Sequence, residues 1–511
     1  MKKHLFAIAL FTLLVAAFGI RFFALGRVPV GMTDDELRET YSAQALWQGS
    51  TLPFLFVVDN FSFNPIPIYI TAPIVGIFGV SMATARAPYA IAGFLAVLGT
   101  FLLVRRLTGN KWLALAAAFC MTFNVWAVQL SRIAYEAGFA LLFYTWGTYV
   151  FLGVAKKHPV RSVAGAMVLF FLAFNSYDAT KFLYVPLLIL LCIFLSRHVN
   201  RRILYTIACF ALATVLIFVG TYGVQPRVRG SQFTVFQNTG AADAAVISAR
   251  SASSSPEFLK RIYHNRITYF SDVFFRHYLY TFSMEYLFFN QEASGIYSLW
   301  LRGSFYFLEL PLLALGGLYI FLKQRRVFAF SVTAMAIAAI SAGIGPEPFT
   351  YATRASFVLP WLSMFIGGGI VYLLELTKKY RVAVVLTILL LYVFSIVGYL
   401  NQYYFEWSKN NAVYFSKGVE GLVRYLAPRS DGKIIEIANM NNAFFLHWAL
   451  ITGRDPDTIS NIVILPSCKA TVADLAPDVV YAANPSCSKE KPSHVILLPD
   501  GTPQWAIYVR E

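Results

Sequence analysis

Three consecutive acids, Asp34, Asp35 and Glu36, follow the first apolar run of the chain, in the stretch GMTDDELR (residues 31–38). Carboxylates are costly beside lipid, so this position needs a physical reason. One reason is local, because Thr33 and Glu36 have the spacing of a capping box and acids favour the positive end of a helix. The other is chemical, because a carboxylate held on the first turn of a helix can act as a general base towards an attacking hydroxyl. The two interpretations are compatible.

The composition indicates where this helix stands. The chain has 511 residues, of which 58% are hydrophobic and 13% charged, whereas soluble domains carry about 25% charged residues. The formal net charge of +16 comes from short basic clusters between apolar runs, a pattern typical of cytoplasmic loops and not of a nucleic-acid-binding surface. We therefore expect a polytopic α-helical membrane protein, with membrane lipids and no nucleic acid among its partners.

Eleven apolar stretches approach the roughly 20 residues that a membrane span needs. They are residues 5–25, 84–104, 112–130, 134–155, 160–177, 182–196, 203–223, 304–322, 327–344, 355–376 and 382–400. The first lacks a clear cleavage site, which favours an uncleaved helix over a signal peptide. The segment 64–80 is apolar but holds three prolines, so we expect it to lie in the outer interface or to re-enter the membrane.

The basic clusters predict the orientation of these spans. They are Lys2-Lys3, Arg105-Arg106, Lys156-Lys157, Arg197–Arg202, Lys323–Arg326 and Lys378–Arg381. All fall on one side if the amino terminus is cytoplasmic. Residues 26–83, 224–303 and 401–511 then lie outside the cytoplasm. In 224–303, the small polar stretch at 240–257 is either a mobile lid over a pocket or a plain surface loop.

The tail, residues 406–511, predicts a small extracytoplasmic α/β domain. KIIEIANM and DVVYAAN have strand patterns, NNAFFLHWALIT has a helical one, and HVILLPDGTPQWAIYVRE fits two strands around an Asp-Gly turn. Cys468 and Cys487 lie in this tail, where a disulfide is possible in an oxidising compartment.

Several motifs in order resemble the GT-C membrane glycosyltransferases, in particular the phospholipid-carrier-dependent group of protein O-mannosyltransferases and aminoarabinose transferases. They are the acidic DE after the first span, NPIPIYITAPIVGIFG, ATARAPYAIAGFLAVLGTFLLVRRLTG, LSRIAYEAGFALLFYTWGTYVFL, YDATKFLYVPLLIL, YLFFNQE, FLELPLLALGGLYIFLK and YATRASFVLPWL. The resemblance covers roughly residues 1–405 and implies a GT-C transmembrane catalytic domain of about 11–13 helices. It also implies a prokaryotic plasma (inner) membrane, with the active site outside the cytoplasm.

The resemblance implies a reaction and a base. A sugar would pass from a polyprenyl-phosphate donor to a hydroxyl of a protein, lipid or glycan on the outer face, with inversion at the anomeric carbon. The DE motif maps onto Asp35-Glu36, with Asp35 as the base. Asp34 is the alternative, because an extra Asp leaves the register open, and Glu36 would orient the site or bind acceptor.

The departing phosphate needs cations at the outer ends of the spans. Arg132, Lys181 and Arg354 stand there and are the predicted phosphate ligands. The alternatives are snorkelling, or an internal pair such as Arg132 with Glu136 at the i,i+4 spacing. Relatives usually carry Arg where Lys181 stands, and Lys cannot supply the two-pronged hydrogen bonding of a guanidinium.

Four further polar residues are predicted to line the substrate site: Asn64, Asp59, Glu136 and Asp178. Asp59 has the alternative of a solvated loop acid, and Asp178 of a simple partner for Lys181. Arg86 is predicted to be a structural anchor at the start of the second span.

We expect no cofactor, although Asp34, Asp35, Glu36 and Asp59 carry the oxygen ligands that a divalent cation would use. Two other functions compete with a transferase. A transporter or flippase of lipid-linked sugars should show matching broken helices in two halves, which the sequence lacks. A membrane-anchored interaction protein would act through its tail.

Overall fold

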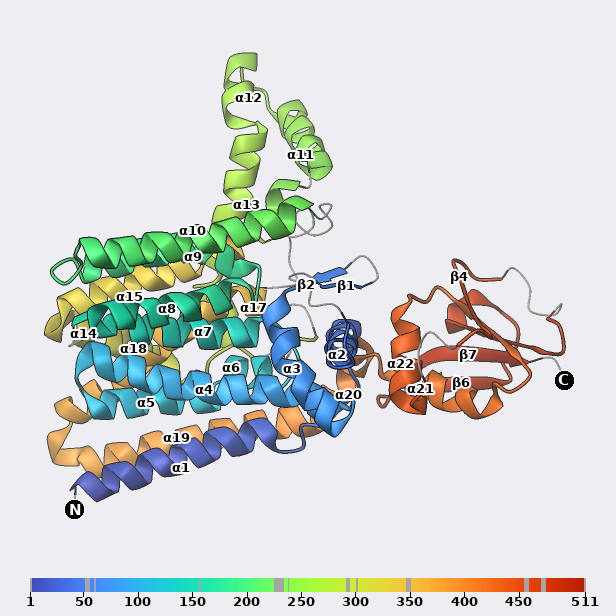
Figure 1. Cartoon of the computed structure of the whole chain (residues 1–511), viewed down its shortest axis with the longest axis horizontal. Helices are drawn as coiled ribbons and strands as arrows, with labels where there is room; N and C mark the ends of the chain where they lie inside the picture. The colour runs from blue at the N-terminus through green and yellow to red at the C-terminus, as the bar shows by residue number, and fades with distance from the viewer. Residues whose placement is uncertain are drawn as a thin grey trace.

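The structure is a computed structural model of the whole chain (Figure 1). It describes residues 2–50, 56–58, 61–155, 158–224, 234–237, 239–290, 295–299, 302–345, 351–454, 459–469 and 475–509. A bundle of long helices carries the amino terminus at one end, and an α/β domain with the carboxyl terminus lies beyond the other end.

Each predicted span coincides with a helical segment of the described chain. These are α1 (Lys2–Phe22), α4 (Met82–Thr108), α5 (Lys111–Phe123), α7 (Ala137–Phe151), α8 (Pro159–Phe174), α9 (Ala179–Phe194), α10 (Arg201–Val224), α14 (Glu309–Lys323), α15 (Arg325–Ala338), α18 (Leu359–Leu376) and α19 (Arg381–Asn401). Seven helical stretches of the described chain are long and apolar enough to cross a membrane, and α5, α8 and α9 are shorter apolar helices. The protein is therefore a polytopic α-helical membrane protein.

Short helices extend several of these spans. After α5 the chain breaks at Asn124, which caps α6 (Val125–Leu130). Helix α15 continues as α16 (Ile340–Ile344), and α17 (Tyr351–Ala355) leads into α18. These breaks lie near the end of the bundle that faces the α/β domain (Figure 1).

The loops with basic clusters meet at the opposite end of the bundle. Arg106 donates to the Tyr149 carbonyl at the end of α7. Gln324, between α14 and α15, donates to the Thr108 carbonyl at 2.9 Å. These contacts join loops that are far apart in sequence, so the basic loops share one end, as their alternation predicts; Lys156-Lys157 lie outside the described residues.

The end near the α/β domain is built from α2 (Asp34–Trp47), a hairpin of β1 (Phe56–Val58) and β2 (Phe61–Phe63), and α3 (Pro65–Phe78). The proline-rich segment is thus a helix, with Pro65 in its first turn and Pro73 inside it. It packs on α2 and α4 at this end of the bundle (Figure 1). Gly76 makes the close approach possible, because a Cβ there would meet the Trp47 ring at 2.2 Å.

The segment after α10 is largely helical. It forms α11 (Thr239–Ala252), α12 (Glu257–Tyr263) and α13 (Arg266–Tyr280), which project from the side of the bundle (Figure 1). The small polar stretch predicted as a loop or lid is mostly α11, because alanine favours helix and Asp243 pairs with Arg266 at 2.6 Å.

The tail folds into the predicted α/β domain. Its elements are α21 (Lys417–Leu426), β3 (Ile434–Ala438), α22 (Ala443–Thr452), β4 (Ile462–Leu465), β5 (Val479–Ala483), β6 (His494–Leu497) and β7 (Pro503–Val509). The sheet order is β4-β3-β5-β7-β6. Strands β3, β4 and β5 are parallel, whereas β7 runs antiparallel to β5 and β6. Cys468 and Cys487 form a disulfide in this domain.

Candidate functional site

The acidic stretch begins α2 as the capping pattern predicts. The Thr33 side chain accepts from the Glu36 amide at 3.1 Å, and a Glu36 carboxylate oxygen accepts from the Thr33 amide at 3.0 Å. This reciprocal box fixes the first turn of α2. The first-turn acids Asp34, Asp35 and Glu36 therefore project in fixed and different directions, and each meets a different environment.

Glu36 is buried in an ion pair. Arg86 of α4 donates to its carboxylate through Nε at 2.8 Å and through Nη2 at 3.0 Å, and both side chains are fully buried. The amide of Ala134 donates to the same carboxylate at 2.9 Å. Because both carboxylate oxygens of Glu36 already accept hydrogen bonds from the protein, we assign Glu36 a structural role in place of the predicted role in orienting the site or binding acceptor. Arg86 has the anchoring role that its place in the sequence suggests.

Asp34 faces the α/β domain. Its carboxylate accepts from Asn441 at 2.7 Å and from Ser416 at 3.2 Å, and His447 Nε2 of α22 lies 3.3 Å away. Burial works to raise the pKa of Asp34, but the hydrogen bonds with His447 and Asn441 outweigh it and lower the pKa to about 2. So acidic a group is a weak base, which disfavours the predicted alternative of Asp34 as the general base.

A second close contact supports the same interface. Gly31 has φ +77°, and a Cβ there would lie 2.2 Å from the Phe415 carbonyl oxygen. The position thus requires glycine for both its backbone conformation and its space. Together with Asp34, Gly31 joins the start of α2 to the chain that leads into α21.

Asp35 is the accessible member of the three acids. Its side chain is 47% exposed, and its contact with Arg38, one turn further along α2, is 3.5 Å long. The Arg38 side chain is only 5% exposed, so Asp35 is the accessible end of this pair. A substrate hydroxyl can therefore approach Asp35, whereas Glu36 is sealed and Asp34 is engaged by the α/β domain.

The segment between α6 and α7, residues 131–136, connects the acidic helix to the rest of the site. Arg132 lies fully buried beside the end of α1. Its guanidinium donates to the carbonyls of Ile20, Arg21 and Val28, each at 2.9 Å, and to the Tyr403 hydroxyl at 3.2 Å.

The Arg132 guanidinium therefore does not face an opening that a phosphate could enter. Among the hydrogen bonds of the described chain, it also has none to Glu136. Its donors bind backbone carbonyls, and its exposure is nil. We replace its predicted phosphate contact with a structural one, in which Arg132 fixes the turn that carries Ala134 and Glu136.

Glu136 belongs to a polar cluster with three other predicted residues. Its carboxylate accepts from the Asn64 amide at 2.7 Å and from the Asn64 side chain at 3.0 Å. Lys181 Nζ donates to Asn64 Oδ1 at 3.3 Å and pairs with Asp178. The structure thus brings Asn64, Glu136, Asp178 and Lys181 together, and the predicted simple pairing of Asp178 with Lys181 is present.

Tyr177 links this cluster to Arg354. The buried Tyr177 hydroxyl donates to the Thr353 side chain at 3.1 Å, and Arg354 follows Thr353 in the chain. Arg354 is 7% exposed and stands at the end of α17.

The acidic helix and this cluster meet through Tyr135. The Tyr135 ring lies edge-on to the Tyr177 ring at 5.9 Å and to the Tyr297 ring at 5.2 Å between centroids. The preceding residue, Ala134, is the one that holds Glu36. Asp35, Lys181 and Arg354 are thus positioned by adjoining parts of one framework.

Sequence reasoning missed several members of this framework. Glu39 is buried on α2 and accepts a hydrogen bond from Tyr89 of α4, and Tyr135 and Tyr177 provide rings. For Glu39 a signal existed, because it lies three residues after Glu36 and so shares its helix face. The tyrosines carried no signal in a chain with 29 of them.

The described residues contain no preformed cluster of metal-ligating side chains. Among these residues, no group of three or more His, Cys, Asp or Glu side chains is arranged to hold an ion. Asp34, Asp35 and Glu36 face different partners, and Asp59 lies outside the described residues.

Comparison with known proteins agrees with the fold. Residues 63–219 match the family model of dolichyl-phosphate-mannose-protein mannosyltransferases. ArnT from Cupriavidus metallidurans bound to undecaprenyl phosphate superposes with a TM-score of 0.52 at 10% identity, over 100% of this chain and 98% of ArnT. Its apo structure gives 0.51 at 11% identity, over 99% and 97%. Among curated proteins, no match is found.

The Archaeoglobus fulgidus oligosaccharyltransferase is also similar. Its apo form superposes with a TM-score of 0.51 at 14% identity, over 89% of this chain. The chain covers 64% of that enzyme's length, which is just under two thirds.

The fold is that of the GT-C membrane glycosyltransferases. The order of the sequence motifs predicts this fold, and the mannosyltransferase family model matches residues 63–219, about a third of the chain.

Proposed function

We propose that this protein transfers a sugar from a polyprenyl-phosphate donor to an acceptor hydroxyl on the outer face of the membrane, with inversion at the anomeric carbon. The GT-C fold supports the transfer. Two similar structures contain a lipid phosphate: ArnT is bound to undecaprenyl phosphate, and the archaeal oligosaccharyltransferase AglB is in complex with dolichol-phosphate and an inhibitory peptide. The acceptor is a hydroxyl of a protein, lipid or glycan.

Asp35 is the proposed general base. This assignment rests on the different surroundings of the three carboxylates. Glu36 is sealed by Arg86, and Asp34 is engaged by the α/β domain, whereas the Asp35 carboxylate is 47% exposed at the start of a rigid helix. A base must be reached by the hydroxyl that it deprotonates. Of the three, Asp35 is the most exposed, at 47% against 30% for Asp34 and 0% for Glu36.

Lys181 and Arg354 are the proposed partners of the donor phosphate. Both cations are largely buried, with Lys181 14% and Arg354 7% exposed, so their surroundings exclude most water. Positive groups fixed at the point where negative charge develops stabilise the transition state more than they would in water. Asn64, Glu136 and Asp178 hold Lys181 in place and set the shape of this region.

The reaction is a single displacement. The acceptor oxygen forms a bond to the anomeric carbon while the bond from that carbon to the phosphate oxygen breaks, and the bonding electrons leave with the phosphate. Asp35 takes the acceptor proton, and Lys181 and Arg354 meet the new phosphate charge. Because the nucleophile enters opposite to the leaving group, one displacement inverts the configuration. No step requires a metal, so we propose a cofactor-independent enzyme.

The test is to reconstitute the full-length protein in vesicles with a radiolabelled polyprenyl-phosphate sugar and an acceptor. The proposal expects free polyprenyl phosphate and glycosylated acceptor in equal amounts, and neither product from Asp35→Asn. Asp34→Asn is the matched control, since it removes a neighbouring charge and should retain transfer. Intact donor that merely changes leaflet would refute the proposal and identify a flippase.

A further inference from the structure

One cavity of the described chain shares no lining residue with the acidic helix α2. It measures about 570 Å³ and sits between α5, α18 and α19, which is within the range of about 300–1,000 Å³ typical of small-molecule sites. Its walls are formed mainly by Leu115, Phe119, Ile370, Leu374, Ile388 and Leu389. The walls are therefore apolar, and none of these residues takes part in the proposed reaction.

The cavity extends from one end of the bundle towards its middle. Along α19 it runs from Arg381 to Tyr392, eleven residue steps that rise about 16.5 Å in a helix. This length equals about half of the roughly 30 Å hydrocarbon core of a bilayer. Its outer edge is open, because Val385 and Leu389 are 42% and 50% exposed. The groove therefore fits a chain that spans one leaflet and enters from the lipid.

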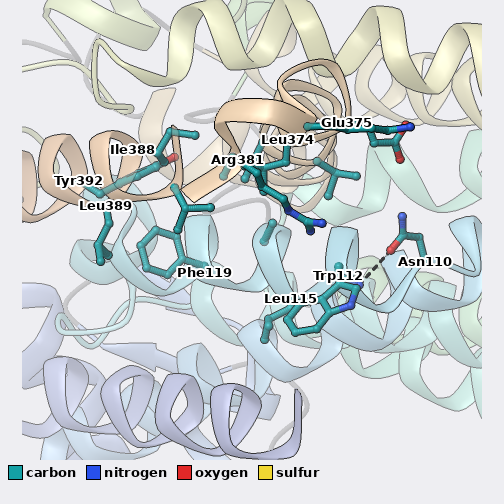
Figure 2. Close-up of a pocket in the computed structure, with 15 residues that line it drawn as sticks. Asn110, Trp112, Leu115, Phe119, Leu374, Glu375, Arg381, Ile388, Leu389 and Tyr392 are labelled. Atoms are coloured by element: carbon teal, nitrogen blue, oxygen red, sulfur yellow. Dashed lines mark hydrogen bonds between the residues drawn. The ribbon is translucent and has the colours of Figure 1, made fainter. Parts of the chain in front are cut away.

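The mouth of the groove is cationic. Lys378 and Arg381 line it, and neither side chain has a hydrogen bond or ion pair among the residues that the structure describes. Figure 2 shows Arg381 pointing into the cavity above Trp112 and Leu115. The acid at the mouth, Glu375, accepts a hydrogen bond from Tyr319 at 2.9 Å.

Other features place this mouth at the level of lipid headgroups. Trp112 is 42% exposed beside Asn110, which accepts from the Trp112 amide at 3.0 Å (Figure 2). Lys111 covers the Trp112 ring at 5.8 Å, and tryptophan with lysine is typical of a membrane interface. A 3₁₀ turn, Lys378–Tyr380, leads directly into α19, so both cations stand at the start of one helical stretch.

We propose that this groove binds one anionic glycerophospholipid from the leaflet at the basic end of the bundle. The phosphate lies between Lys378 and Arg381, and one acyl chain follows the apolar wall of α19 to Tyr392. The charge of the mouth, the length of the groove and its opening to lipid all fit this occupant. The site is distinct from the proposed transferase site and does not depend on that reaction.

The experiment measures lipid binding to the full-length protein in detergent by native mass spectrometry, after delipidation and titration with phosphatidylglycerol or phosphatidylcholine. We expect one tightly bound phosphatidylglycerol. The paired variant Lys378→Gln/Arg381→Gln should weaken it about 30-fold, since each cation near a lipid surface contributes a factor of about five. Phosphatidylcholine binding should change little.

Two further variants separate the parts of the site. Arg201→Gln/Arg202→Gln removes two exposed cations from the start of α10, at the same end but outside the groove, and should leave phosphatidylglycerol binding intact. Leu389→Trp narrows the groove from a half-exposed position and should weaken both lipids.

Three results would overturn the inference. The first is equal binding of the two lipids to the unmodified protein. The second is unchanged phosphatidylglycerol binding in the groove variants. The third is displacement of phosphatidylglycerol by an equimolar amount of undecaprenyl phosphate, which would identify a site for the carrier lipid instead.

Discussion

Substituting Glu36 by Gln should destabilise the fold strongly, because it leaves the Arg86 charge buried without a partner. Both side chains are fully buried, and Arg86 donates twice to the Glu36 carboxylate. Breaking a buried ion pair from one side costs about 3–5 kcal/mol. The Gln oxygen can still accept from Thr33 or Ala134, so we expect the lower end, about 3 kcal/mol.

The neighbouring substitution Asp35→Asn is the matched control. Asp35 is 47% exposed, although its partner Arg38 is only 5% exposed, and their contact is long, at 3.5 Å. The exposed end of the pair can be solvated, so we expect its loss to cost about 1 kcal/mol. Two adjacent acid-to-amide changes should therefore differ by about 2 kcal/mol in stability. In turnover the order should be reversed: Asp35→Asn should lose more activity than Glu36→Gln, because Asp35 and not Glu36 is the proposed base.

The assay is the unfolding of the purified protein in detergent, followed as a double-mutant cycle of Glu36→Gln and Arg86→Gln. If the pair is coupled as its geometry indicates, the double variant should cost less than the sum of the single variants by about 2 kcal/mol. Additive effects within about 0.5 kcal/mol would refute the reasoning, because they would mean that the two charges do not stabilise each other.

The remaining predictions concern four residues and one metal chelator. Arg132→Gln should lower the unfolding midpoint without changing donor affinity, because its donors bind backbone carbonyls; a weaker donor affinity at normal stability would restore it as a phosphate ligand. Lys181→Gln and Arg354→Gln should each lower kcat/KM at least about tenfold with a polyprenyl-phosphate sugar, and unchanged kinetics would remove them from the site. Because the folded pKa of Asp34 is depressed to about 2 from 3.8, its stabilisation of the domain contact is present above about pH 4 and is lost as pH falls towards 2; limited proteolysis across this range should show release in the parent protein and no such transition in Asp34→Asn. EDTA should leave transfer unchanged, and a loss that Mg²⁺ or Mn²⁺ restores would contradict the cofactor-independent reaction.

The membrane architecture was largely predictable, because span length and the alternation of basic loops are local properties of the sequence. The start of α2 was predictable for the same reason, since Thr33 and Glu36 are three residues apart and form both halves of the capping box. In the tail, the Asp500-Gly501 turn between β6 and β7 followed from its turn residues.

Other elements gave weaker local signals. Strand β4 has only four residues, IVIL, and is recognisable as a strand only beside β3. Helix α11 carries small polar residues that also suit a loop, and its contact between Asp243 and Arg266 spans 23 positions. Contacts between residues so far apart in the chain produce no periodic pattern in the local sequence, so the sequence does not predict them.

The roles within the candidate site were the least predictable. Glu36 and Asp35 are adjacent and chemically similar, and their environments differ only because Arg86, 50 residues away, seals one of them. Arg132 resembled a phosphate ligand because the sequence shows its charge and not the three carbonyls that surround it. The grouping of Asn64, Glu136 and Lys181 likewise depends on the packing of separate helices.

The central claim is that the Asp35 carboxylate deprotonates the acceptor while the donor is held elsewhere in the site. The most direct test compares donor affinity and turnover in Asp35→Asn, with Asp34→Asn alongside. We predict that Asp35→Asn binds the polyprenyl-phosphate sugar within about twofold of the parent protein and loses about 10²–10⁴-fold in kcat. Undiminished turnover in Asp35→Asn, or a comparable loss confined to Asp34→Asn, would contradict the assignment.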